Sequence, residues 1–217
     1  MLERYIQAIS IADPGLEEPG ATRERLKDRF PRGATRRMTQ LGMLVGAALD
    51  DLAPRPDDAM VYASSYAESR ALEGYLESFP TASPTLFQTS IHPSAVQQAM
   101  ITRQHPVGEF FPMTGRGHLL AQALQAAMLA SAPRVLVCGG EERGTWLLER
   151  GYASARTFAF GLALSTSHDA ALGKVELVRA GKENAEISLE KFFDALRQRE
   201  TLDAIAAPGL RLKLTWL

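Results

Sequence analysis

The chain has 217 residues, enough to bury a substantial core, and we expect a single domain over residues 1–217. Hydrophobic residues make up 46% of the chain and charged residues 23%, which is the balance of an ordinary globular protein. The formal net charge of -1 gives no reason to expect nucleic acid or an anionic membrane as the main partner.

The first half of the chain is predicted to alternate strands and helices. A first strand covers residues 5–15 and stops at Pro14 and Gly15, and residues 16–37 are polar and irregular. The elements expected next are a mostly buried helix over 36–52, a short strand over 59–65 and an amphipathic helix over 66–79. Residues 83–105 are expected to hold a loop, a strand-like piece and a helix that starts near Pro93.

The second half continues the alternation. Residues 109–113 precede a turn that leads into a helix over 118–131. The elements expected after this helix are an apolar strand over 134–142, strands over 157–167 and 173–181 that are antiparallel, a helix over 188–205 and a closing edge strand over 210–217. Alternating strands and apolar helices predict an α/β domain in which a mixed sheet carries buried helices. A C-terminal helix and strand would complete it.

Local features narrow the class of protein further. The longest apolar stretch, residues 115–132, contains an arginine, a histidine and two glutamines, so we expect no membrane span. The N-terminus carries a charged pair where a signal peptide needs an apolar segment. The single cysteine, Cys138, excludes an internal disulfide and is typical of a reducing compartment. We therefore expect a cytoplasmic protein.

A glycine-flanked threonine, Thr114, stands between residues 109–113 and the next helix. At a helix N-terminus, free N–H groups and the helix dipole stabilise an anion, but a hydroxyl also needs an adjacent base to act as a nucleophile. His118 would approach Thr114 only if the helix starts early, and no acid lies nearby in the sequence to orient it. The simpler interpretation is that Thr114 caps the helix.

The other polar positions favour structural roles. The four histidines do not have zinc-ligand spacing, so we expect no metal, and Cys138 is interpreted as a small buried hydrophobe. Residues 139–142, "GGEE", are expected to form a tight turn in which Glu141 or Glu142 bonds nearby backbone. No phosphate-binding loop or dinucleotide motif accompanies them, so no cofactor is expected.

Residues 23–37 are rich in arginine. Such a segment is usually a solvated surface. The functional alternative is docking of an acidic partner rather than a nucleic acid, because a single aromatic residue, Phe30, lies among the basic ones, whereas nucleic-acid binding favours repeated interleaving.

Residues 91–142 run "IHPSAVQQAMITRQHPVGEFFPMTGRGHLLAQALQAAMLASAPRVLVCGGEE". This order resembles the N-terminal half of β-ketoacyl synthases of the thiolase superfamily, where a "TACASG" nucleophile elbow leads into a buried helix and then a strand ending "AGGxEA". Residues 5–16 and 36–52 look like the first strand and early helix of that family. Within it, the chain is most similar to short chain-length-factor-like proteins associated with bacterial aryl polyene and xanthomonadin-type pigment clusters.

The resemblance implies half of a thiolase-like fold with its chemistry removed. Aligning the glycine of "CASG" on Gly117 puts the catalytic cysteine of the family at Thr114. The second half of the family supplies catalytic histidines, whereas residues 182–217 contain no histidine. A half fold would also leave apolar helices uncovered unless the helix at 188–205 or a partner covers them.

The function implied by the resemblance is that of a non-catalytic subunit that pairs with an active β-ketoacyl synthase, or with itself, in fatty acid or polyene biosynthesis. Such a subunit would stabilise its partner and set product length. The residues expected at the partner interface and acyl tunnel are Phe110, Phe111, Met113 and Arg116. The residues expected to meet an acidic acyl carrier protein are Arg32, Arg36 and Arg37.

Two alternatives remain open from the sequence. One is an acyltransferase or hydrolase that uses Thr114 with His118. The other is a free-standing homodimer that binds acyl chains.

Overall fold

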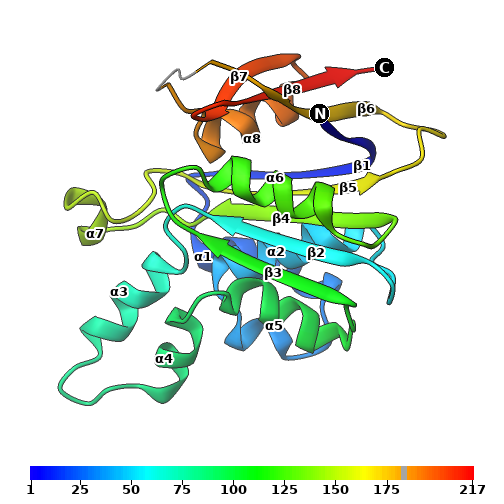
Figure 1. The fold of residues 1–217 in the computed structure, drawn as a ribbon. Helices are drawn as coiled ribbons and strands as arrows, with labels where there is room; N and C mark the ends of the chain where they lie inside the picture. The colour runs from blue at the N-terminus through cyan, green and yellow to red at the C-terminus, as the bar shows by residue number, and fades with distance from the viewer. Residues whose placement is uncertain (182–184) are drawn as a thin grey trace.

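A computed structural model describes residues 1–181 and 185–217 and contains one continuous eight-stranded sheet (Figure 1). The strands are β1 (Leu2–Gly15), β2 (Ala59–Ser64), β3 (Glu109–Thr114), β4 (Arg134–Glu141), β5 (Thr157–Ser165), β6 (Gly173–Arg179), β7 (Leu202–Ala207) and β8 (Leu210–Trp216). Their order across the sheet is β3-β2-β4-β5-β1-β6-β8-β7. Strand β2 pairs in parallel with β3 and β4, and the other neighbours pair antiparallel. The predicted mixed sheet is confirmed.

Helices cover both faces of this sheet. They are α1 (Pro19–Leu26), α2 (Gln40–Asp51), α3 (Ser69–Glu77), α4 (Pro84–Ser90), α5 (Ser94–Arg103), α6 (Leu119–Leu129), α7 (Trp146–Glu149) and α8 (Leu189–Gln198). Two short 3-10 turns, Lys27–Arg29 and Ala34–Arg37, lie between α1 and α2. Helices α3 and α4 form an arm that projects from one end of the sheet (Figure 1).

The central strands are apolar on both sides because both sides are covered. In β4, Val135 and Val137 pack into a core with α6 and α8, whereas Leu136 and Cys138 pack into a second core with α2 and α5. This alternation follows from the period of two along a strand. The unbroken apolar run of residues 135–138 therefore reflects burial on both faces, as the sequence predicts.

Helix α8 covers the same face as α6. Its Phe192 and Phe193 lie against two strand residues, with ring centroids 5.8 Å from Phe160 and 4.5 Å from Phe158 respectively. Ser188 caps α8 and accepts the N–H of Lys191 at 3.2 Å. The sequence left open whether the C-terminal helix or a partner covers the apolar helices. On this face of the sheet, α8 covers them.

The C-terminal region corrects three expectations. The helix predicted over 188–205 ends at Gln198, because Arg199 takes a left-handed conformation (φ 53°) that a helix cannot continue. Residues 202–207 form β7, which is the edge strand, so β8 lies inside the sheet between β6 and β7. Strands β5 and β6 pair with β1, which lies between them, rather than with each other.

The regions expected to be irregular contain more helix than predicted. Residues 16–37 hold α1, which starts at Pro19, and the two 3-10 turns. Residues 84–90 form α4 instead of a strand-like piece: Ser83 caps it and Pro84 occupies the first turn.

Gly139 and Gly140 belong to β4 and do not form the tight turn predicted from "GGEE". A Cβ added at Gly139 would lie 2.4 Å from the carbonyl oxygen of Ala63, and one at Gly140 would lie 2.3 Å from that of Phe158. The glycines are therefore needed because neighbouring strands approach the β4 backbone closely, not because the chain turns.

We predict that Gly139→Ala lowers the free energy of unfolding by about 3 kcal/mol, since the added methyl group overlaps backbone that cannot move without disturbing the β2–β4 pairing. Urea denaturation measures the effect. The matched control is Gly20→Ala in α1, where no atom lies within 4 Å of the added Cβ; this change should alter stability by less than about 1 kcal/mol. Equal stability of the two variants would contradict the close approach of the Ala63 carbonyl oxygen to the β4 backbone at Gly139.

Candidate functional site

The turn between β3 and α6 is the site that the resemblance singled out. Thr114 is the last residue of β3, pairs with Ser64 of β2 and is exposed. Helix α6 begins five residues later, and its N-cap is His118, in a left-handed conformation (φ 60°) with no side-chain cap bond. The capping role predicted for Thr114 is therefore wrong. Its hydroxyl also lies outside the first turn, where N–H groups would stabilise an anion.

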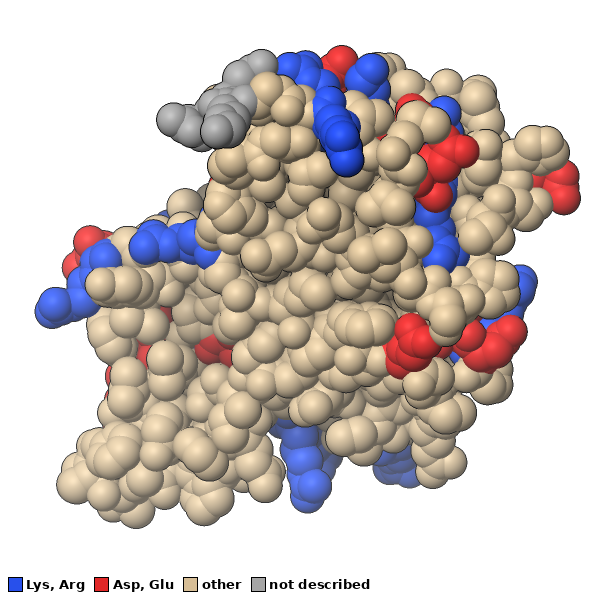
Figure 2. Space-filling view, viewed as in Figure 1, with Lys and Arg blue, Asp and Glu red and all other residues tan. Residues whose placement is uncertain are grey.

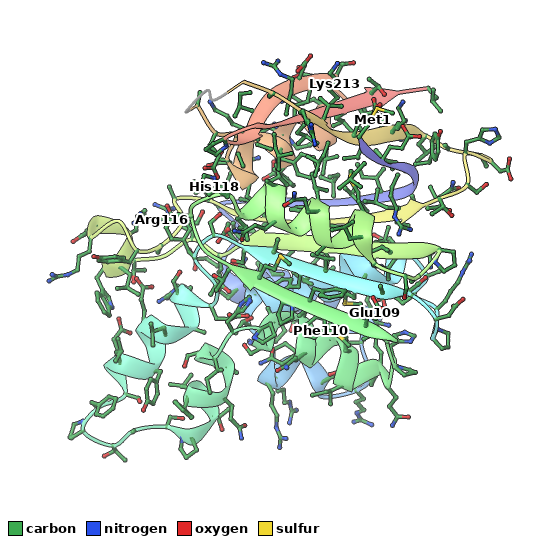
Figure 3. The ribbon with its side chains drawn as sticks, viewed as in Figure 1. Met1, Glu109, Phe110, Arg116, His118 and Lys213 are labelled. Carbon is green, nitrogen blue, oxygen red and sulfur yellow. The ribbon has the colours of Figure 1, made fainter. Side chains whose placement is uncertain are left out.

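His118 has an acidic partner that the sequence did not reveal. Its Nδ1 lies 3.0 Å from Glu186 Oε2, and its backbone N–H donates to the other oxygen of the same carboxylate. The imidazole is 49% exposed and stands with Arg116 on the loop before α6 (Figure 3). Glu186 follows β6 in a different part of the chain, and no motif spacing links the two residues.

A cavity of about 220 Å³ lies beside this turn. Arg116 and Glu186 line it together with apolar α6 residues and the buried Glu141. The guanidinium of Arg116 donates to the Gly151 carbonyl oxygen at 2.9 Å and lies over the ring of Tyr66, 5.9 Å from its centroid. Arg116 is thus tied to its own chain beside the cavity.

Glu141, at the end of β4, anchors the loop that follows β2. Its carboxylate accepts the N–H of Ser65 at 2.5 Å, the N–H of Tyr66 at 3.3 Å and the hydroxyl of Ser64 at 3.1 Å. Glu142 accepts the N–H of Leu41, in the first turn of α2, at 3.0 Å. The prediction that these glutamates bond nearby backbone is confirmed.

Burial raises the pKa of the carboxyl groups of Glu141 and Glu142. Desolvation raises the pKa of Glu141 to about 7 against the lowering effect of its hydrogen bonds, and it raises the pKa of Glu142 to about 7 in the same way. An acid with a higher pKa in the folded chain than in the unfolded chain binds extra protons when folded. The free energy of unfolding therefore falls as the pH rises from 4.5 to about 7.

We predict that Glu141→Gln removes the pH dependence that Glu141 gives to the free energy of unfolding. This contribution amounts to about 3 kcal/mol between pH 4.5 and 8. Relative to the wild type, the variant should gain stability steadily as the pH rises through this range. Denaturant unfolding at several pH values gives the two curves. The control is the exposed Glu200→Gln, whose curve should run parallel to that of the wild type. A Glu141→Gln curve that also runs parallel would contradict the burial argument.

The three β3 residues expected at a partner interface, Phe110, Phe111 and Met113, do not all lie on the same face of the sheet. Phe110 packs against the α2 and α5 core, whereas Phe111 and Met113 pack against the α6 core. All three are half-buried, and β3 is an edge strand of the sheet. The surface over α6 and β3 carries few charges (Figure 2), and Glu109 stands at the start of the strand (Figure 3). The structure therefore groups Phe111 with Met113 and separates Phe110 from them.

The arginines predicted to meet an acidic partner are also separated. Arg36 and Arg37 lie on the second 3-10 turn and line a hollow that also contains Arg23 and Arg70. Arg32 is exposed but does not line that hollow.

Within residues 1–181 and 185–217, no group of three or more histidine, cysteine or acidic residues is placed to hold a metal ion. Over the same ranges, no helix has the length and apolar character to cross a membrane. Burial raises the pKa of the Cys138 thiol, which therefore stays protonated as part of the core.

No family model and no curated protein sequence matches the chain. Solved structures do match. One is a ketosynthase (ApeO) in complex with its chain length factor (ApeC) from Xenorhabdus doucetiae, with a TM-score of 0.71 and 18% identity over 99% of this chain and 100% of that chain. The ishigamide ketosynthase/chain length factor has a TM-score of 0.63 and 15% identity over 82% of this chain and 68% of that chain. A β-ketoacyl synthase from Burkholderia phymatum STM815 has a TM-score of 0.57 and 12% identity, over 88% and 68%.

These matches show the fold. The chain has the thiolase-like α/β fold of ketosynthases, with its mixed sheet between layers of helices. The resemblance inferred from residues 91–142 is confirmed at that level.

Proposed function

We propose that this chain is a non-catalytic, chain-length-factor-like subunit that pairs with an active β-ketoacyl-ACP synthase in cytoplasmic fatty acid or polyene pigment biosynthesis. The observation that carries the proposal is Thr114. Within a ketosynthase-like fold, an exposed threonine ends β3 where the resemblance puts the catalytic cysteine. The match to a chain from a ketosynthase and chain length factor complex supports a ketosynthase as the partner.

The surroundings of Thr114 argue against the condensation chemistry of the family. A threonine hydroxyl is a weak nucleophile unless a base takes its proton. Among the described residues, none makes a hydrogen bond with the Thr114 side chain. The helix N-terminus that would acidify a nucleophile starts at Leu119, beyond the turn.

The edge of the sheet offers the surface for pairing. Strand β3 uses one side to pair with β2, and its other side has no partner strand among those described. An unpaired edge presents N–H and C=O groups that another chain's strand can bond. Phe111 and Met113 lie half-buried on the α6 side of this edge, where few charges oppose an apolar contact (Figure 2).

In this function, Phe111, Met113 and Arg116 reach the acyl tunnel of the partner and set product length. Phe110 would contact the partner from the other face of β3. The exposed Arg32, Arg36 and Arg37 would meet an acidic acyl carrier protein, since exposed guanidinium groups attract carboxylates at long range.

One observation favours a second candidate function, acyl transfer or hydrolysis. Glu186 holds the His118 ring through Nδ1, which is how a carboxylate orients a general base. Thr114 would then carry the acyl group.

A free-standing homodimer that binds acyl chains would use the same β3 edge against a second copy.

We predict that Met113→Asp weakens the complex with the synthase at least tenfold, because a charge would enter an apolar contact. Surface plasmon resonance measures the affinity, and circular dichroism checks that the variant is folded. The control is Leu217→Asp, at an exposed position directly after β8, which lies far from β3 in the strand order; this variant should bind like the wild type. Unchanged affinity of Met113→Asp would place the interface elsewhere.

We predict that no acyl adduct forms on Thr114 when the chain is incubated with an acyl thioester, because the hydroxyl has no hydrogen-bonded base among the described residues. Intact-protein mass spectrometry of the wild type and Thr114→Ala makes the comparison. An added acyl mass on the wild type that Thr114→Ala lacks would establish the acyltransferase alternative instead.

A further inference from the structure

The arm formed by α3 and α4 is attached to the rest of the protein through polar contacts. In the described chain, no side chain of residues 65–94 belongs to either hydrophobic core. The buried residues in this range are all polar: Glu68, Ser69, Glu73, Thr89 and Ser94. Segments with few buried apolar contacts open at a lower free energy than a core does. The arm is therefore the segment expected to open before the sheet unfolds.

The arm has an apolar cluster of its own that keeps α3 and α4 together. The ring centroid of Tyr75 lies 5.4 Å from that of Phe79 and 5.3 Å from that of Phe87. These rings join the end of α3 to α4. The two helices project together from one end of the sheet (Figure 1), and we expect them to move as one body.

Buried carboxylates fasten this body to its neighbours. Glu68, at the N-cap of α3, accepts the N–H of Ala95 in α5 at 3.1 Å. Glu73, within α3, accepts the N–H of Thr145 at 2.8 Å and the N–H of Leu147 at 2.7 Å. Glu68 thus closes the base of the arm, and Glu73 binds its side to α7.

Glu142, at the end of β4, faces these two carboxylates from the other side. It is 8% exposed and lines a hollow whose other walls include parts of α3 and α4. Arg70, Glu68 and Glu73 all act on its carboxyl group electrostatically, and Arg70 is itself paired with Glu73 at 3.1 Å. Ionisation of Glu142 therefore adds a further buried negative charge beside the two acids of the arm.

The protonation of Glu142 is linked to the position of the arm. Burial, and after it the two arm carboxylates, raise the pKa of Glu142 to about 7 against the lowering by the Leu41 N–H and by Arg70. Once the arm has moved away, water reaches the carboxyl group and its pKa returns toward 4.5. The closed arm is thus favoured fully below pH 4.5 and loses this advantage as the pH rises to about 7.

Other ionisable groups lie around Glu142 on the elements packed against it. Tyr62 of β2 faces it, and burial raises the pKa of this phenol, which stays neutral. The hollows that Glu142 lines also contain Glu17, Glu18, Arg23, Arg36, Arg37, Arg70, Glu77, Arg143 and Glu149. His92 pairs with Glu68 at 3.1 Å. Histidine is the side chain that ordinarily changes charge near neutral pH, so an experiment must separate His92 from Glu142.

We propose that the arm formed by α3 and α4 is a pH-dependent lid, which opens as the pH rises and Glu142 ionises. Opening carries with it the exposed apolar side chains of the arm, which are Leu76, Phe79, Leu86, Phe87 and Ile91. The proposal rests on the contacts of the arm and not on pairing with a ketosynthase. It therefore stands or fails separately from the proposed function.

Amide hydrogen exchange of the full chain, resolved by NMR, measures the opening. The N–H groups of Thr145 and Leu147 donate to Glu73 of the arm, so they exchange when the arm leaves. After correction for the intrinsic exchange rate, their protection should fall roughly tenfold or more between pH 5 and 8. The amide of Val137, in the centre of the sheet, should stay more strongly protected at every pH.

The variant Glu142→Gln tests the source of the pH dependence. Its side chain cannot ionise but can still accept the Leu41 N–H, so the protection of Thr145 and Leu147 should change by less than about threefold over the same pH range. The matched control is Glu200→Gln, at an exposed position, which should keep the pH dependence of the wild type. Circular dichroism checks that both variants are folded, and the wild-type measurement does not depend on them.

Three results would overturn the proposal. In the wild type, the protection of Thr145 and Leu147 could be independent of pH, or it could equal that of Val137 at every pH, which would mean that the arm opens only with the whole fold. The third result is a Glu142→Gln variant that keeps the pH dependence of the wild type. Loss of that dependence in His92→Gln would then assign it to the pair of His92 and Glu68 instead.

Discussion

Two buried carboxylates at the end of β4 hold together the end of the sheet at which the candidate sites lie. Glu141 binds the loop after β2 and lines the cavity beside the turn between β3 and α6, whereas Glu142 binds the start of α2 and lines the hollow that contains Arg36 and Arg37. Each is buried at a cost in desolvation that appears as a pKa raised to about 7. The glycines before them in β4 let β2 and β5 approach closely enough for these bonds to form.

The completeness of the core decides where a partner can bind. A half fold suggested that apolar helices would be left open, but α8 packs its phenylalanines beside α6, and α2 and α5 fill the other face. Among the described strands, the two edges of the sheet, β3 and β7, each pair with a strand on one side alone, and β3 is the edge next to Thr114. Pairing through that edge would add strand bonds and apolar contact without exposing the existing core. For the proposed pairing, the β3 edge is therefore favoured over a face of the sheet as the interface.

The sequence predicted the elements that depend on the residue pattern of a short segment. It failed where the structure depends on backbone conformation or on contacts between distant parts of the chain. The apolar run of β4 and the amphipathic pattern at the start of α8 are readable along the chain. The end of α8 is not, because it depends on Arg199 taking a left-handed conformation without a glycine, and Leu202 and Ile205 fit a helical spacing as well as a strand. The Glu186–His118 pair joins residues 68 positions apart. The hollow that contains Arg36 and Arg37 is also formed only by folding, which brings α3 and α4 opposite the second 3-10 turn.

The central claim is that a chain without a working nucleophile changes what an active ketosynthase makes. The most direct measurement is the product-length distribution of the purified partner synthase with its carrier protein and substrates, with and without this chain. The account predicts that adding the chain raises turnover and shifts the distribution, and that the Thr114→Ala variant does the same. Equal turnover and equal product lengths in the presence and absence of the chain would contradict it.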